Sequence, residues 1–517
     1  MKTLFKRIST RKQNKQDGHN QAANGYNPTD QNTFTSKVEQ MSVEEFPLQN
    51  LAELLGVTAD VSPSEDGSCS VESESDSAQQ RQRNVRLIQA SVSQHLPKPP
   101  SDLDQNLQQH LVNVQKTVRN ELMRLSPRLE KMGLIGCLID CYYRQTLDHI
   151  SDLFNKVQSC KKSFELMKWI LHPYLSQELL SHPDLGDFPL STELVAKAEN
   201  LLLENVPEEV RKCLDEILLI HINQDVCDSE ESCIGLYVDI IQVVNDMPEK
   251  AQQINPKLSH DIREACFQEL KIFLGRFTSE QTKFLREKAK KAIPNKIHFF
   301  KILKTCKEIK EYVQTKSEGI EDSLVKEIET TLENMEDVTL KLLMEIVAEM
   351  AERHLQNYFT TKHKRFFLIP DVQTHFPEVS WCPDVKKRVM DEAYKLIAHT
   401  YLKHLVRSSQ KKLRKCWSPD VVQKVIEDAE LLHDTISELA PGVEQWKLPE
   451  LLEDENIDAV KITVASMQHS CYKEDEELLS TLLVWKGLSK SQARQVLGAL
   501  PEHKPRQTNF LSECRCL

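Results

Sequence analysis

Apolar residues recur along most of the chain at the spacing of one helix face. Between Ser101 and Gly133, successive apolar positions lie three or four residues apart, which is the repeat of an α-helix. We expect Ser101 to cap this helix, Pro127 to kink it and Gly133 to end it. The apolar positions are Leu103, Leu107, Leu111, Val114, Val118, Leu122, Leu125, Leu129 and Met132.

The same amphipathic repeat continues toward the C-terminus. Strand-like alternation is absent, and so is a fixed-period repeat of the solenoid kind. Pro207 and the Ser418–Pro419 pair stand where the first turn of a helix belongs. The pattern predicts an all-α fold, an elongated rod of stacked antiparallel helical bundles. Further helices are expected at about 134–159, 161–181, 191–204, 207–225, 257–275, 279–292, 322–360, 384–415, 418–440 and 475–499.

The first 80 residues lack this repeat. They are rich in Gln, Asn, Ser and Thr, and residues 62–78 form an acidic serine run, so we expect a disordered tail. Ser62 and Ser73 each have an acid three residues on, which makes them candidate phosphorylation sites. The expected domains are the tail at 1–80, three helical bundles at 81–205, 206–320 and 321–445, and a C-terminal helical cap and tail at 446–517.

Composition agrees with a helical protein of the cytoplasm. Only 13 of 517 residues are Gly, which disfavours glycine-dependent sheets and phosphate-binding loops. No apolar run approaches the ~18 residues of a membrane span, and the N-terminus lacks the apolar core of a secretory signal. The 14 cysteines show no disulfide or zinc spacing, and most fit buried positions in a reducing compartment. The net charge of −12 and the low aromatic content of 6% disfavour nucleic acid as a partner.

No motif for catalysis, for a metal or for a cofactor is present. The phosphate-loop, dinucleotide, zinc-protease, hydrolase and kinase signatures are all missing. His354 and His363 are nine residues apart, and His399 and His404 are five apart, so neither pair has the spacing that aligns two ligands on a helix. We therefore expect a protein that is not an enzyme and needs no cofactor.

The N-terminus has the pattern of an amphipathic helix that binds an anionic membrane. Apolar residues occupy positions i, i+3, i+4 and i+7 from Met1, and six cations with no acid surround them. The alternative is a disordered basic arm or an import-like run. Phosphorylation of Ser9 would subtract charge from the cluster. The expected lipid-binding residues are Lys2, Leu4, Phe5, Lys6, Arg7, Ile8, Arg11, Lys12 and Lys15.

Two basic runs interrupt the acidic body of the chain. Residues 386–415 contain ten Lys or Arg and two acids, and residues 283–304 contain eight and one. Such runs are either solvated helix faces or a surface for an acidic partner or lipid. On a helical wheel of the later run, one side is apolar and consists of Met390, Tyr394, Ile397 and Tyr401. The opposite side is the expected partner or lipid surface and consists of Lys403, Arg407, Lys411 and Arg414.

The chain ends in Cys514-Arg515-Cys516-Leu517. A cysteine four residues from a final leucine has the outline of a geranylgeranyl signal, although the middle residues are not aliphatic. Cys514 and Cys516 are therefore candidate lipidation sites, by prenylation or by reversible acylation. A lipid together with the basic N-terminus would provide the two signals that stable anchoring requires.

Three segments resemble the exocyst complex component three family. They are WILHPYLSQELLSHPDL at 169–185, Trp417-Ser418-Pro419 followed by DAELL at 428–432, and LLVWKGLSK at 482–490. The basic start and short N-terminal region look most like the tumour necrosis factor alpha-induced protein two branch (M-Sec), with the exocyst-component-three-like paralogues close to it. The family commonly has an acid after the glycine of the last motif, where this chain has Leu488.

The resemblance implies the fold and a role in exocytosis. It implies a rod of stacked bundles that binds or localises the exocyst, contacts SNARE proteins and docks vesicles at the plasma membrane. For the M-Sec branch it also implies work with a Ral-type small GTPase and phosphoinositides in membrane protrusions such as tunnelling nanotubes. It implies no catalytic residues. The alternative is a soluble scaffold that recruits acidic partners through 386–415 without lipid.

Overall fold

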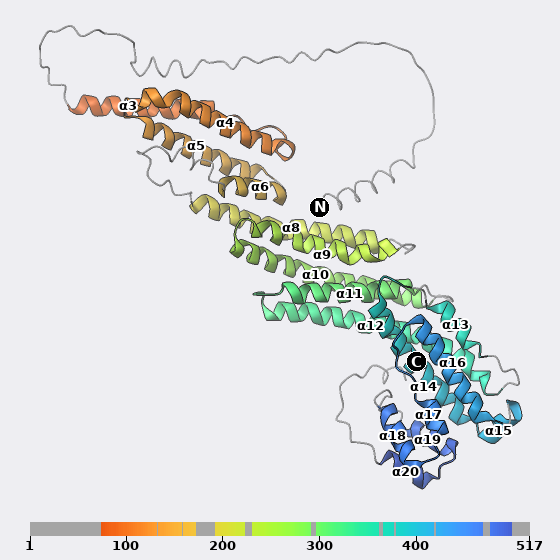
Figure 1. The fold of residues 1–517 in the computed structure, drawn as a ribbon. Coiled ribbons are helices and arrows are strands. Elements are labelled where there is room, and N and C mark those ends of the chain that lie inside the picture. Colours follow the sequence, from red (N-terminus) through yellow and green to blue (C-terminus); the bar gives the residue numbers. More distant parts are fainter. Residues whose placement is uncertain are drawn as a thin grey trace, which may run out of the picture. The chain divides into compact units, whose positions relative to one another are not determined.

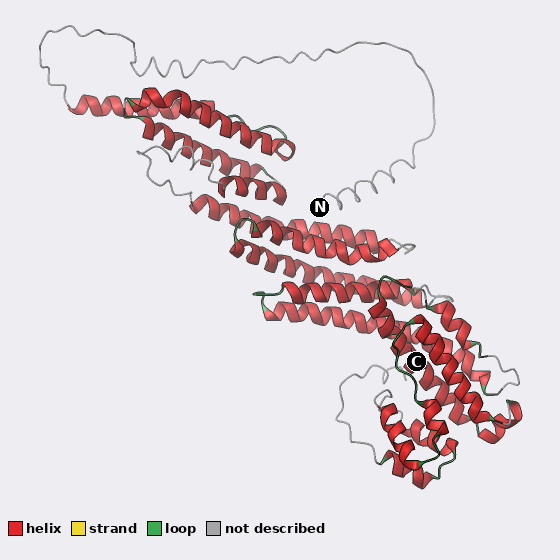
Figure 2. Cartoon of the chain, in the orientation of Figure 1, coloured by secondary structure: helices red, strands yellow, loops and turns green. Residues whose placement is uncertain are grey.

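The fold is known from a computed structural model. It describes residues 74–131, 133–157, 159–171, 192–222, 230–290, 296–360, 366–376, 379–417, 420–468 and 476–498. Over these ranges every regular element is an α-helix, which confirms the all-α prediction (Figure 2). None of the described helices is long and apolar enough to cross a lipid bilayer.

The chain divides into two compact units. The first comprises residues up to Lys212 together with Val243–Cys266, and the second comprises Cys213–Gln242 together with the residues from Phe267 onward. The predicted division into a tail, three helical bundles and a C-terminal cap is not tested by this grouping and stays a prediction. The helices of the first unit are α3 (Glu74–His95), α4 (Leu103–Glu130), α5 (Ile135–Lys156), α6 (Cys160–Leu171) and parts of α8 (Thr192–Ile222), α9 (Glu230–Gln252) and α10 (Pro256–Ala289).

Helix α4 shows how the pattern builds the core of the first unit. Every described apolar position of the predicted stripe from Leu107 to Leu129 is buried, and those from Val114 to Leu129 pack with residues of α3 and α5. The cap differs from the prediction, because the side chain of Asp102 rather than Ser101 accepts a hydrogen bond from the backbone N–H of Gln105. Gly133 adopts a φ of 63°, a left-handed conformation that suits the residue after a helix.

Two predicted helix breaks are absent. Helix α8 continues through Pro207, which the sequence placed in the first turn of a new helix. One buried apolar stripe extends on both sides of the proline, and its burial outweighs the cost of one missing backbone hydrogen bond. Helix α10 likewise continues through Gly275 and Ser279. The stripe in α8 consists of Ala198, Leu202, Val206, Val210 and Leu214.

The second unit contains the C-terminal helices (Figure 1). Helices α11 and α12 lie side by side, joined by a turn in which Gly319 has a φ of 81°. Helix α14 packs on both of them, and α16 and α19 pack in turn on α14. Besides the remaining parts of α8, α9 and α10, the helices of this unit are α11 (Ile297–Lys316), α12 (Asp322–Tyr358), α13 (Leu368–His375), α14 (Pro383–Arg407), α15 (Gln410–Cys416), α16 (Val421–Leu439), α17 (Leu448–Glu453), α18 (Ile457–Gln468), α19 (Glu476–Lys486) and α20 (Lys490–Leu497).

Candidate interaction surface at the junction of α14 and α15

The basic run at 386–415 forms two helices instead of the single helix expected. Helix α14 ends at Arg407, Ser408 is extended with φ −105° and ψ 118°, and α15 begins at Gln410. The side chain of Ser409 caps α15 by accepting a hydrogen bond from the backbone N–H of Lys412. The predicted stripe is therefore divided between two helices.

The break is stabilised by Trp485, which lies far away in the sequence. Its indole N–H donates to the carbonyl oxygen of Ser408 over 2.9 Å, and the side-chain amide of Gln410 donates to the carbonyl oxygen of Trp485 over 2.9 Å. The first bond uses a carbonyl that a continuing helix would use for its own ladder. The third family-like motif thus has a structural role, because its tryptophan holds α19 against the junction.

The apolar side of α14 is buried as the wheel predicts. Met390, Tyr394, Ile397 and Tyr401 are all 4% exposed or less. Trp417 lies next to this layer, where its ring stacks on Phe359 with centroids 5.2 Å apart. Its indole N–H donates to the carbonyl oxygen of Tyr358 over 3.3 Å. The Trp417 of the second motif therefore joins the end of α15 to the end of α12.

Asp428, from the same motif, is a buried carboxylate that accepts two hydrogen bonds and lies beside one lysine. Its Oδ2 accepts hydrogen bonds from the hydroxyls of Tyr358 and Tyr401, over 2.7 and 2.9 Å. The Nζ of Lys424 lies 3.0 Å from its Oδ1. Burial raises the pKa of Asp428 even though these donors act to lower it. The network connects α12, α14 and α16 behind the junction.

Five cations lie at the surface of the junction between α14 and α15. We call Arg407, Lys411, Lys412, Arg414 and Lys415 the basic corner; all five side chains are exposed. Among the residues that the structure describes, none of the five has a carboxylate in ion-pair contact, although Arg414 reaches the side-chain oxygen of Gln410 over 3.4 Å. The junction therefore presents uncompensated positive charge on a rigid base.

Lys403 does not belong to this corner. Its Nζ lies 3.2 Å from Glu352 on α12, and His404 contacts the other oxygen of the same carboxylate over 2.6 Å. Burial acts to raise the pKa of Glu352, but the hydrogen bonds from His404 and Lys403 lower it overall. Within the described part of the chain, three of the four predicted surface residues thus make no ion pair with a carboxylate, and the fourth joins two helices.

The earlier basic run does not form a comparable surface. Lys288, Lys296 and Lys301 are at most 7% exposed, and Lys304 pairs with Glu308 over 2.7 Å. Lys288 also lies over the ring of Phe284, 4.9 Å from its centroid. Burial lowers the pKa of Lys296 to about 8. Four of the eight cations of this run are thus buried or paired within the fold, whereas Lys283, Arg286 and Lys290 are exposed.

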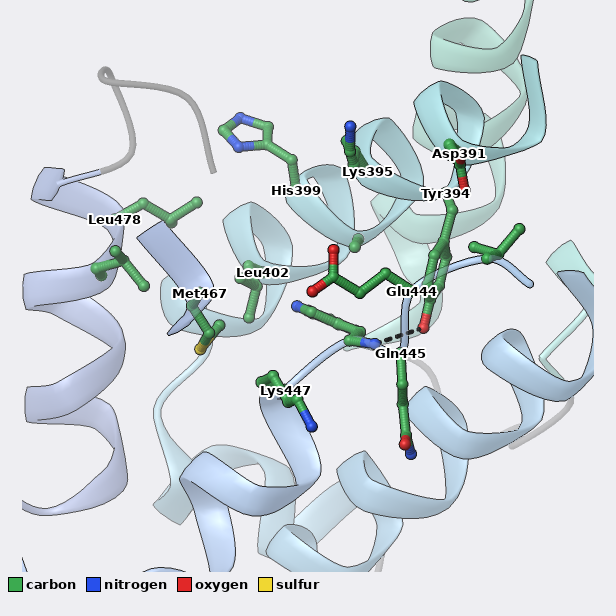
Figure 3. Close-up of a pocket in the computed structure, with 14 residues that line it drawn as sticks. Asp391, Tyr394, Lys395, His399, Leu402, Glu444, Gln445, Lys447, Met467 and Leu478 are labelled. Atoms are coloured by element: carbon green, nitrogen blue, oxygen red, sulfur yellow. Dashed lines mark hydrogen bonds between the residues drawn. The ribbon is translucent and has the colours of Figure 1, made fainter. Parts of the chain in front are cut away.

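A small apolar cavity lies behind α14 (Figure 3). It has a volume of about 60 Å³ and lies between α14, the segment 443–447, α18 and α19. The hydroxyl of Tyr394 accepts a hydrogen bond from the backbone N–H of Trp446 over 3.3 Å at its wall. Ligand sites usually measure about 300–1,000 Å³, so this cavity suits one apolar side chain better than a cofactor.

A larger cavity of about 340 Å³ lies between α11, α12 and α14. Its charged side chains pair with one another: Lys307 contacts Asp384, and Arg388 contacts Glu336 over 2.8 Å. The hydrogen bond with Lys307 lowers the pKa of Asp384, and the same bond raises the pKa of Lys307. Both shifts favour the charged forms, whereas acid–base catalysis needs a group that changes protonation near neutral pH. Throughout the described residues, no cluster of three or more metal-ligating side chains occurs.

Several predicted sites lie outside the described residues. They include the basic start with Ser9, the serines at 62 and 73, and the two C-terminal cysteines. Most of the first family-like segment, from His172 onward, does too. The lipid-binding, phosphorylation and lipidation predictions for these positions stay predictions. The predicted partner or lipid surface did not include Lys412 and Lys415, because the helical wheel assumed one unbroken helix over residues 386–415.

Comparison with known proteins supports the fold. No family model matches the sequence, and no curated protein matches it. Among solved structures, the chain is similar to one described as the crystal structure of M-Sec, with a TM-score of 0.60 and 15% sequence identity. The similarity covers 89% of this chain and 84% of that one. At this identity the likeness establishes a shared helical fold, and M-Sec is the branch that the sequence motifs resemble.

Proposed function

We propose that this chain is a non-enzymatic tethering or adaptor protein of the exocyst-like kind. It would act in exocytosis, binding or localising exocyst subunits, contacting SNARE proteins and docking vesicles at the plasma membrane. Likeness to the M-Sec branch extends this to membrane protrusion with a Ral-type small GTPase. The M-Sec-like fold supports the proposal, and so do Trp417, Asp428 and Trp485, the motif residues that assemble the C-terminal unit.

The observation that carries the proposal is the basic corner. Five exposed cations, none of them paired with a carboxylate of the described residues, stand on a base of buried aromatic rings and a buried carboxylate. Helices fixed in this way hold a binding surface at a constant position, which an adaptor needs. Each cation near an anionic leaflet contributes roughly 1 kcal/mol to attraction. The corner would thus act beside the basic N-terminus as a second contact with anionic lipid.

Vesicle sedimentation tests the two surfaces separately. Deletion of residues 1–16 should reduce binding to vesicles containing phosphatidylserine and phosphoinositide, and so should reversal of the corner at Arg407, Lys411 and Arg414 to Glu. Reversal of three exposed cations elsewhere, Lys116, Lys257 and Lys326, provides a control with the same change of charge. Equal binding to neutral and anionic vesicles would refute lipid attachment.

The basic corner also favours a second candidate function. A soluble scaffold would recruit an acidic protein through the same cations without touching lipid. A pull-down with exocyst subunits and a Ral-type GTPase, with and without the corner reversal, separates the two functions. Loss of protein binding together with absence of vesicle binding would establish the scaffold instead of the tether.

A further inference from the structure

Ser409 stands at the centre of the basic corner. It is exposed between α14 and α15, and its backbone is extended with φ −68° and ψ 141°. Arg407 lies two residues before it, and Lys411 and Lys412 lie two and three residues after it. Arg414 follows at the fifth position, and no acid occurs between Glu392 and Asp420. The sequence around Ser409 therefore carries only positive charges.

We propose that Ser409 is a phosphorylation site for a kinase that recognises basic sequences. Such kinases select substrates by charge, because acidic side chains around their cleft bind cations on both sides of the acceptor serine. The hydroxyl oxygen of Ser409 attacks the γ-phosphorus of ATP, and the bond from that phosphorus to the β–γ bridging oxygen breaks. ADP leaves, and the hydroxyl proton passes to the catalytic aspartate of the kinase.

The neighbouring serine lacks the features of an acceptor. Ser408 is only 7% exposed, and its carbonyl oxygen is bound by the indole of Trp485. The hydroxyl oxygen of Ser409 accepts the capping hydrogen bond from the backbone N–H of Lys412, which is long at 3.4 Å. Helix α15 is short, and among its described side chains Leu413 alone is fully buried. Local opening of its first turn is therefore expected to cost less than opening a longer helix.

The modification would change the charge on which the proposed function depends. A phosphate adds about two negative charges and three acceptor oxygens among five cations, so the net local charge falls from five to about three. Arg407 lies two residues before it and Lys412 three residues after it in sequence, and charge-assisted hydrogen bonds from these cations would stabilise the phosphate. Phosphorylation would therefore weaken attachment to an anionic surface. This consequence rests on the proposed function, whereas the modification itself does not.

Phosphate mapping tests the modification. The full-length chain is incubated with ATP and the catalytic domain of a basophilic kinase, and incorporation at each serine is measured by mass spectrometry. We expect Ser409 to be modified, Ser408→Ala to remain a substrate, and Arg407→Ala with Lys411→Ala to reduce the rate at Ser409 by about tenfold or more. Modification of other serines with none at Ser409, or an unchanged rate in the double variant, would overturn the proposal.

Vesicle binding tests the consequence. Phosphorylated wild-type chain should bind phosphatidylserine and phosphoinositide vesicles at least about fivefold more weakly than the unmodified chain, while Ser409→Ala treated with the kinase should bind as before. Equal binding of both forms would refute the switch. If the unmodified chain also fails to bind, the proposed lipid function is wrong, and the mapping result still decides the modification site.

Discussion

At the scale of single residues, Asp428 has the greatest structural consequence. One side chain with no exposed surface satisfies two tyrosine hydroxyls and lies beside a lysine, so it joins three helices. Burial of a carboxylate costs free energy, and removal of one of its partners costs more. The network explains why a charged residue occupies the inner face of α16.

Replacement of Asp428 should therefore destabilise the second unit strongly. We expect Asp428→Ala to lower the free energy of unfolding by about 3–5 kcal/mol, because it leaves the hydroxyls of Tyr358 and Tyr401 buried without an acceptor. Asp428→Asn, which keeps one oxygen acceptor and the shape, should cost less. Urea denaturation of the three proteins measures the difference, and equal stability of Ala and wild type would contradict the role of the network.

At the scale of elements, the clasp between Trp485 and the α14–α15 junction fixes the C-terminal helices. Trp485→Phe keeps an aromatic ring but removes the indole N–H, which leaves the carbonyl of Ser408 without this donor. We expect a loss of about 1–3 kcal/mol and faster hydrogen exchange in α19 and α15. Val484→Ala, at a neighbouring exposed position, is the matched control. Unchanged exchange in the Trp485 variant would show that the clasp does not hold the junction.

Helices α4 and α5 are joined by a pair of histidines, from which we expect the first unit to be sensitive to acid. The Nε2 atoms of His110 and His149 lie 2.8 Å apart, so one ring donates and the other accepts. Burial lowers the pKa of His110. Burial and the charge of His110 lower that of His149, with Asp152 acting to raise it and Lys156 to lower it further.

These lowered pKa values determine the sign of the pH effect. The unfolded chain binds protons at about pH 6.5, where the folded histidines remain neutral, so the stabilisation is complete above that pH and is lost as the pH falls through the folded values. We expect hydrogen exchange in α4 and α5, corrected for intrinsic rates, to accelerate between about pH 7.5 and pH 5.5. The double variant His110→Leu with His149→Leu should lose this acceleration; its persistence would assign it to other groups.

At the scale of the whole molecule, charge is distributed unevenly. The chain has a net charge of −12, yet the first 16 residues carry six cations and the basic corner carries five more. An acidic body opposes approach to an anionic surface, so the proposed attachment would depend on the two positive regions. The same separation of charge makes the interaction sensitive to salt.

Salt should therefore control membrane attachment. Raising the ionic strength from about 0.05 M to about 0.3 M shortens the screening length, and we expect the vesicle-bound fraction to fall severalfold. The corner reversal described above should show a weaker dependence on salt than its control with the same charge. Binding that is independent of salt would indicate attachment by apolar insertion or a covalent lipid instead.

Much of the fold could be predicted from local patterns. The three-and-four spacing from Leu107 to Leu129 identified residues that are all buried, and the wheel identified the buried face of α14 from Met390 to Tyr401. The errors occurred at helix ends. Pro207 lies inside α8, and the basic run breaks at Ser408, because burial of one stripe overrides a proline and a distant tryptophan captures a carbonyl.

The amino-acid order alone established that the chain is helical and which face of each helix is buried. Helical hydrogen bonds and amphipathic repeats join residues three or four apart, so a short window of sequence contains them. The packing of segments that are distant in sequence established where α14 ends and which cations of the basic run remain exposed to solvent. Trp485 acts on Ser408 from 77 residues away, and Glu352 pairs with Lys403 from 51 residues away. Contacts at such separations leave no periodic signal in the sequence, and they define the basic corner.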